Sequence, residues 1–131
     1  LEKIYKEKKR TKKFMNYSQF ITDMYIFFLS QKEKDEELNF FTEGDLGEYD
    51  YFPQPLPSAY IAVKNKNNTK RYFLDYFDEY TPDWVIRRRV KQIYLTYAEE
   101  GKWEANTDNA SFPAILFIFS NVCFGKSPTW L

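Results

Sequence analysis

The feature that most constrains the fold of this chain is one short aromatic run with a single acid inside it. Residues 70–77 read Lys-Arg-Tyr-Phe-Leu-Asp-Tyr-Phe, and such a run of ring and apolar side chains is typical of a buried β-strand. The polar stretch 65–68 predicts a turn before it, and residues 58–63 predict a partner strand before that turn. The presence of Asp75 within such a strand needs a physical explanation, because burying an unpaired carboxylate is costly.

The flanking sequence predicts two helices and a further strand. Helical spacing of apolar residues between 16 and 34 predicts a core-facing helix with Asn16 as its N-cap, after a charged lead or linker over residues 1–13. Residues 37–42 predict a strand, and the glycines and prolines that follow predict a loop over 45–57. A second helix is predicted to start with Thr81 as cap and to end at Gly101, and its inward face is predicted to hold Ile86, Val90, Ile93, Tyr94 and Tyr97.

Residues 112–119 form a nearly unbroken apolar run, which predicts a strand buried on both faces in the middle of a sheet. The element order is then helix, three strands, helix, strand. Consecutive strands favour antiparallel pairing, and the helix before the last strand permits a parallel crossover. We therefore expect one α/β (α+β) domain over residues 1–131, with a mixed sheet of about four strands flanked by helices.

Composition excludes several kinds of site. The chain has no His, so catalysis by His and metal ligation by His are excluded within it. Its one Cys, Cys123, permits neither an internal disulfide nor a paired-cysteine zinc site, which favours a reducing, cytoplasmic setting. No apolar run is long enough for a membrane span. Because the chain opens on Leu1 and not on Met, we expect a fragment of a longer protein with an upstream region missing.

Charge is balanced overall, with 19 basic and 19 acidic residues, but it is unevenly distributed. Residues 1–13 are basic, residues 31–50 are acidic, and residues 87–91 hold four basic groups and no acid. Consecutive helical residues point in different directions, so the three arginines of that run do not share one patch. The candidate nucleic-acid contacts are Arg87, Arg88, Lys91, Lys70 and Arg71, and the alternative is a solvated helix face balanced by the acids of residues 33–37.

The element order resembles the minimal αβββαβ core of the PD-(D/E)XK, restriction-endonuclease-like fold. The sequence also resembles the replication-relaxation family of plasmids and conjugative elements over residues 16–120. Residues 56–61 match the start of a family strand that tends to open with Pro-Asp-Gly or Pro-Asp-Ala, and residues 72–75 match an apolar run that closes on an acid. The helix over 85–97 and the last strand over 112–119 complete the likeness. The resemblance implies a mobile genetic element and an upstream winged-helix DNA-binding region.

This chain departs from the nuclease pattern at the residues that would hold a metal. The resemblance implies an acid where Ser58 stands, an acid at Asp75, and an acid or Lys where Phe77 stands. One carboxylate is a poor Mg²⁺ site, because Mg²⁺ takes one or two carboxylates together with phosphate oxygens. Asp50 and Asp78 are the nearest candidates to assist Asp75. Otherwise Asp75 pairs with Arg89 or Lys91 of the next helix, or lies on a solvated sheet edge.

The sequence leaves three functional hypotheses. The first is a catalytically inactive nuclease-like domain of a replication or conjugation accessory protein, which binds DNA or a replication or transfer partner and needs no cofactor. In this hypothesis Ser58 and Asp75 are relics of a metal site. The second is an active nuclease that uses Mg²⁺ held by Asp75 and an acid of the 45–50 loop. The third is a protein-interaction or homodimerisation module whose contact surfaces are the last strand and residues 49–52.

Two tryptophans fall outside the predicted elements. Trp103 and Trp130 are either exposed, where a ring can stack on a base, or packed against the edges of the core.

Overall fold

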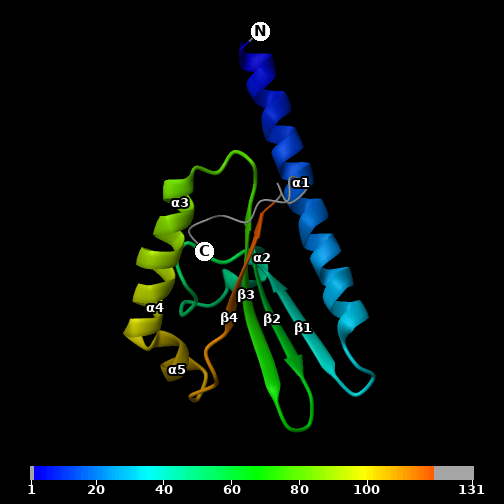
Figure 1. Cartoon of the computed structure of the whole chain (residues 1–131), viewed down its shortest axis with the longest axis vertical. Helices are drawn as coiled ribbons and strands as arrows, with labels where there is room; N and C mark the ends of the chain where they lie inside the picture. The colour runs from blue at the N-terminus through cyan, green and yellow to red at the C-terminus, as the bar shows by residue number, and fades with distance from the viewer. Residues whose placement is uncertain (1, 120–131) are drawn as a thin grey trace.

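The computed structural model describes residues 2–119, with the side chains of residues 17–119, and Figure 1 shows its arrangement. Its elements run in the predicted order of helix, three strands, helical segment and strand. Their bounds are α1 (Glu2–Gln31), β1 (Glu37–Thr42), α2 (Glu43–Leu46), β2 (Ala59–Lys64), β3 (Thr69–Phe77), α3 (Asp83–Arg88), the π-helical turn η1 (Arg89–Tyr94), α4 (Leu95–Glu100), α5 (Lys102–Asn106) and β4 (Ala114–Phe119).

The described strands form one mixed sheet in the order β1-β2-β3-β4. β1 pairs antiparallel with β2, and β2 pairs antiparallel with β3. β3 pairs parallel with β4, as a crossover through the helical segment allows. The predicted mixed α/β sheet is therefore confirmed.

β4 corrects one prediction. Within the described residues this strand pairs with β3 alone and lies at the edge of the sheet, not in its middle. Its apolar sequence has another cause, because both of its faces are packed. Phe117 stacks on Phe77 on one face, and Leu116 and Ile118 join the cluster beneath α1 on the other.

The β2–β3 hairpin closes at the predicted turn. The side-chain oxygen Oδ1 of Asn65 accepts hydrogen bonds from the backbone N–H groups of Asn67 at 2.9 Å and Asn68 at 2.7 Å. The backbone N–H of Asn65 donates to the carbonyl of Asn68 at 2.9 Å. An Asn that satisfies the turn backbone in this way fixes the register of the two strands it joins.

α1 covers one face of the sheet and α3, α4 and α5 cover the other (Figure 1). Beneath α1, Phe28 packs on Ala59, Ile61 and Leu74. The expected helix start at Asn16 is wrong, because α1 runs without a break from Glu2 to Gln31. A capping signal sets a boundary only where the preceding residues favour another conformation, and the charged residues before Asn16 are good helix formers.

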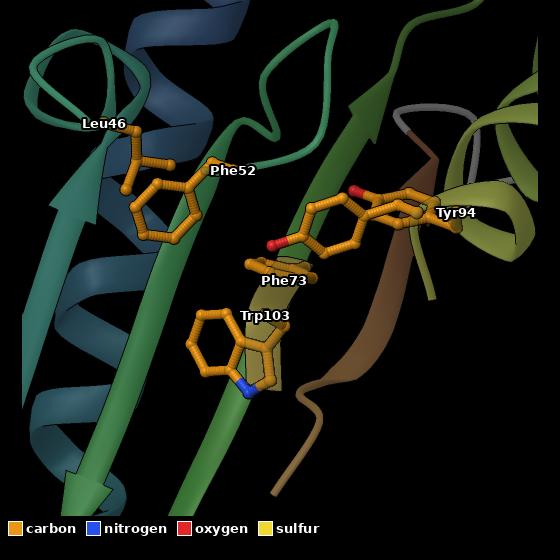
Figure 2. Packing of buried hydrophobic residues seen from close by; sticks show 6 residues of the cluster. Leu46, Phe52, Phe73, Tyr94 and Trp103 are labelled. Atoms are coloured by element: carbon orange, nitrogen blue, oxygen red, sulfur yellow. The ribbon is translucent and has the colours of Figure 1, made fainter. Parts of the chain in front are cut away.

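The opposite face holds an aromatic core centred on Phe73 (Figure 2). The ring of Phe73 is fully buried, and it lies edge-on to Trp103 with 5.7 Å between ring centroids and stacks on Tyr94 at 6.0 Å. Leu46 and Phe52 approach this core from the segment between β1 and β2. Ring-rich packing of this kind buries a large apolar area per residue and adds favourable edge-to-face contacts.

The helical segment after β3 follows its predicted pattern with one change at its start. Thr81 does not cap the helix; its hydroxyl donates to Asp78 Oδ1 at 3.1 Å, and Pro82 takes the N-cap position. The predicted inward residues are buried or half-buried, and Gly101 ends the segment with a left-handed φ of 71°.

The predicted loop contains α2, a single helical turn at its beginning. Beyond it, Phe52, Pro53 and Pro57 are buried, so much of this irregular segment packs on the domain. Among the described residues, no helix combines the length and the apolar character needed to cross a membrane.

Candidate functional site

The two candidate relic residues lie side by side at one end of the β2–β3 pair. Ser58 precedes β2 directly, Asp75 lies in β3, and both are buried. The backbone N–H of Tyr76 donates to Ser58 Oγ at 3.2 Å, which joins the two positions across the strands. The fold therefore brings together the positions that the resemblance assigned to metal binding.

A third residue, Arg89, meets the Asp75 carboxylate from the helical segment. Its Nε donates to Oδ2 at 2.9 Å and its Nη2 donates to Oδ1 at 3.3 Å, so both carboxylate oxygens are engaged. This is one of the two partners that the sequence suggested for Asp75, and the ion pair is almost fully withdrawn from solvent. Two-point contact of this kind matches the planar guanidinium to the planar carboxylate.

The rest of the guanidinium is also satisfied. Nη1 donates to the carbonyl oxygen of Pro55, and Nη2 donates to the hydroxyl of Tyr94 at 3.2 Å. The guanidinium carbon also lies 4.7 Å from the centroid of the Tyr94 ring. Burial by itself would lower the pKa of Arg89, but its hydrogen bond to Asp75 and the nearby negative charge hold that pKa above its ordinary value.

The π-helical turn explains how Arg89 and Tyr94 both reach the sheet. They are the first and last residues of η1, five positions apart. In an α-helix such a pair points in different directions, whereas the wider π turn brings residues five apart onto one face. Burial raises the pKa of the Tyr94 hydroxyl strongly, and the negative charge of Asp75 adds to this effect, so Tyr94 is held as a neutral partner.

These residues do not fit a Mg²⁺ site. Both oxygens of Asp75 are bound to Arg89, and Phe77, two residues on, offers no ligand. Asp78 accepts from the backbone N–H of Tyr80 at 2.9 Å, and Asp45 accepts from the backbone N–H of Thr42 at 2.9 Å. Among the described residues, no group of three or more His, Cys, Asp or Glu side chains is placed to hold a metal ion.

A cleft of about 580 Å³ lies between the α1 side chains Tyr17, Ser18 and Ile21 and the α2 region, and Leu56 completes its wall. The Tyr17 hydroxyl donates to Glu43 Oε2 at 3.2 Å. Burial raises the pKa of Tyr17; the Ser58 hydroxyl lowers it, and the charges of Glu43 and Asp75 raise it further. Tyr17 and Glu43 therefore extend the polar cluster of Ser58 and Asp75 toward solvent. Neither residue has a recognisable sequence signal, because a Tyr on an apolar helix face predicts packing and Glu43 is one of many acids in residues 31–50.

The five candidate nucleic-acid contacts fall into two separate groups. Arg87, Arg88 and Lys91 are exposed on the helical segment that follows β3. Lys70 and Arg71 lie at the other end of β3, next to the hairpin, where Lys70 is exposed and Arg71 donates to Ser111 Oγ at 3.0 Å. The fold therefore does not join all five into one basic surface.

Of the two alternatives for Trp103, packing against the core is correct, although the residue lies within α5 and not outside the regular elements. Trp103 is buried, and its indole N–H lies 3.1 Å from the carbonyl oxygens of both Ala110 and Ser111. Trp130 lies outside the described residues. Trp84, which lies inside the second predicted helix, is 64% exposed. Its spacing of four residues before Arg88 was the signal that could have placed it on the outer face.

Comparison with protein-family models, with curated proteins and with solved structures finds no match.

Proposed function

We propose that this chain is a catalytically inactive nuclease-like domain that works by binding nucleic acid. The observation that carries the proposal is the Asp75 carboxylate, whose two oxygens are both engaged by a buried arginine. A guanidinium supplies a fixed positive charge where the nuclease chemistry needs a metal with open coordination positions. The domain can keep its scaffold with this ion pair, but the pair leaves no carboxylate free to activate water.

The likeness to replication-relaxation proteins is part of the same proposal. The element order, the mixed sheet and the adjacency of Ser58 and Asp75 all agree with what that likeness implies. We therefore propose a replication or conjugation accessory role on a mobile genetic element, in which this domain adds contacts to DNA.

The binding surface that we propose is the outer side of the helical segment after β3. Within the part of the chain that the structure describes, Arg87, Arg88 and Lys91 form no ion pair with an acidic side chain. Their charges are therefore available to phosphate groups. Each phosphate contact releases condensed counterions, so affinity should fall steeply as salt rises.

The test is fluorescence anisotropy with labelled DNA over a series of salt concentrations. We expect salt-dependent binding that is lost in the triple variant Arg87→Ala, Arg88→Ala, Lys91→Ala. A charge-matched control, Lys34→Ala, Lys66→Ala, Lys102→Ala, removes three exposed lysines elsewhere and should keep most of the affinity. Equal loss in both triple variants would contradict a local binding surface, and a lack of binding at low salt would contradict nucleic-acid binding altogether.

The active-nuclease alternative is tested on the same protein with plasmid DNA and Mg²⁺ or Mn²⁺. We expect no cleavage above the level of an Asp75→Ala variant. Metal-dependent cleavage that Asp75→Ala abolishes would overturn the proposal.

A second candidate function, self-association, is favoured by a different surface. Near its C-terminal end, α1 exposes four large apolar side chains between 44% and 57%, namely Tyr25, Ile26, Phe27 and Leu29. Large apolar side chains exposed close together on one helix often mark a protein contact. A mass that rises with concentration in light scattering, and that Ile26→Asp returns to that of the monomer, would support this function; a constant monomer mass would exclude it.

A further inference from the structure

The outer face of the helical segment after β3 has a regular composition. Exposed residues recur as adjacent pairs every fourth position, at 83–84, 87–88, 91–92 and 95–96. The positions between the pairs include Ile86, Arg89 and Tyr94, which are buried against the sheet. Because these pairs are exposed while positions between them pack on the sheet, the pairs lie along the outer side of the segment.

This face combines an exposed indole with cations that form no ion pair among the described residues. Trp84 is 64% exposed, and in the described structure no other ring packs against it. Arg87 and Arg88 lie one turn further along the same face, and Lys91 lies one turn beyond them. Asp83 is the one acid among the eight positions of the four pairs, so the first three turns keep a net positive charge.

An exposed Trp is unusual because it forfeits a large burial of apolar area. The cations beside it select an anionic ligand, and the indole selects one that also offers a flat ring. Single-stranded nucleic acid offers both groups, since its phosphates are regularly spaced and its bases are free to stack on aromatic side chains. In a duplex the bases already stack on one another, so Trp84 would gain little there.

We propose that Trp84, Arg87, Arg88 and Lys91 form a short binding face for single-stranded nucleic acid, with Trp84 stacking on a base and the three cations contacting phosphates. The inference rests on the proposed function and specifies its ligand. From Trp84 to Lys91 the face is roughly 10 Å long at 1.5 Å per residue, which is enough for a few nucleotides. Neither the PD-(D/E)XK pattern nor the Asp75–Arg89 ion pair is needed for it.

The test compares an oligothymidylate of about 15 nucleotides with a hairpin duplex of similar charge, by anisotropy and by tryptophan fluorescence. We expect tighter binding of the single strand and quenching of the tryptophan emission. Trp84→Ala should weaken single-strand binding at least about fivefold, whereas Trp84→Phe should keep most of the affinity because a ring still stacks. Leu95→Ala, a change at an exposed apolar residue one turn beyond the four proposed binding residues, is the matched control and should bind normally.

The salt dependence of binding distinguishes the contribution of the three cations from that of the Trp84 ring. Three phosphate contacts with a single strand predict a slope of about −2 in a plot of log affinity against log salt. Arg88→Ala should make the slope shallower by about 0.7, and Trp84→Ala should leave it unchanged while lowering affinity.

The failure of this inference differs from the failure of the proposed function. If Trp84→Ala binds both ligands as the parent chain does, or if duplex is bound as tightly as single strand, the stacking face is wrong while DNA binding stands. If no nucleic acid binds at low salt, both proposals are overturned. In that case an acidic protein partner becomes the better occupant of this face.

Discussion

Neighbouring arginines on the two sides of one helical segment lie in opposite environments, one buried and one exposed to solvent. On the inner side, Arg89 is 7% exposed, paired with Asp75 and hydrogen-bonded to Pro55 and Tyr94. On the outer side, Arg87 and Arg88 lie in solvent without an ion pair among the described residues. The comparison separates two uses of positive charge, one that maintains the fold and one that is free for a ligand. Substitutions on the inner side should change stability, and those on the outer side should change binding.

The largest effect should follow from breaking the inner ion pair. Asp75→Ala leaves a buried guanidinium without its carboxylate, and we expect it to lower the free energy of unfolding by about 3–5 kcal/mol in urea denaturation. The matched double variant Asp75→Leu, Arg89→Met replaces both charges with apolar groups and should recover most of that loss. If the single variant unfolds at the same urea concentration as the parent chain, the ion pair does not maintain the fold.

A smaller effect on the inner side should appear at high pH. Burial raises the pKa of Tyr94 and of Tyr97 above the ordinary value of 10. Because the folded-state pKa is the higher one, this contribution to stability is complete below about pH 10 and is lost as the pH rises above it. The free energy of unfolding should therefore fall above about pH 10, while absorbance at 295 nm shows these two phenols still protonated in the folded chain.

Tyr94→Phe is the control for that measurement, since it removes one of the two raised groups and should make the alkaline decline less steep. Ionisation of every tyrosine near pH 10 in the folded chain would contradict the buried environment of Tyr94.

The smallest effect on stability should come from the outer side. Arg88→Ala removes an exposed charge that forms no ion pair within the described part of the chain, and we expect the free energy of unfolding to change by no more than about 0.5 kcal/mol. The same variant should nevertheless weaken nucleic-acid binding. A large loss of stability in Arg88→Ala would remove the distinction between the two sides.

The sequence predicted the strands and their order because each strand is a compact apolar run bounded by clear turn residues. The 65–68 turn is an example, since Asn65 alone satisfies two backbone donors. The place of β4 could not be predicted in the same way. An unbroken apolar run indicates that both faces of a strand are covered by other parts of the protein. It does not indicate which sheet edge the strand joins, and this decides the position of β4.

The candidate site was predictable in its parts but not in its assembly. Asp75 was conspicuous as an acid within an apolar strand, and Arg89 was one of two suggested partners. The π-helical turn that presents Arg89 and Tyr94 together has no simple sequence signal, and neither has the bond from Tyr17 to Glu43. Trp84 lies inside a predicted helix, where a large ring is expected to pack, so its exposure was not predicted. These features depend on contacts between residues far apart in the sequence, and a local sequence pattern does not predict such contacts.

The irregular segment between α2 and β2 is attached to the domain by side chains that come much later in the chain. Tyr97 donates to the carbonyl of Tyr51, 46 residues earlier, and Arg89 reaches the carbonyl of Pro55 across 34 residues. A ribosome-bound chain that has emerged only as far as β3 therefore lacks both attachments. During synthesis these two hydrogen bonds can form only after the crossover helix has emerged and folded back across the sheet.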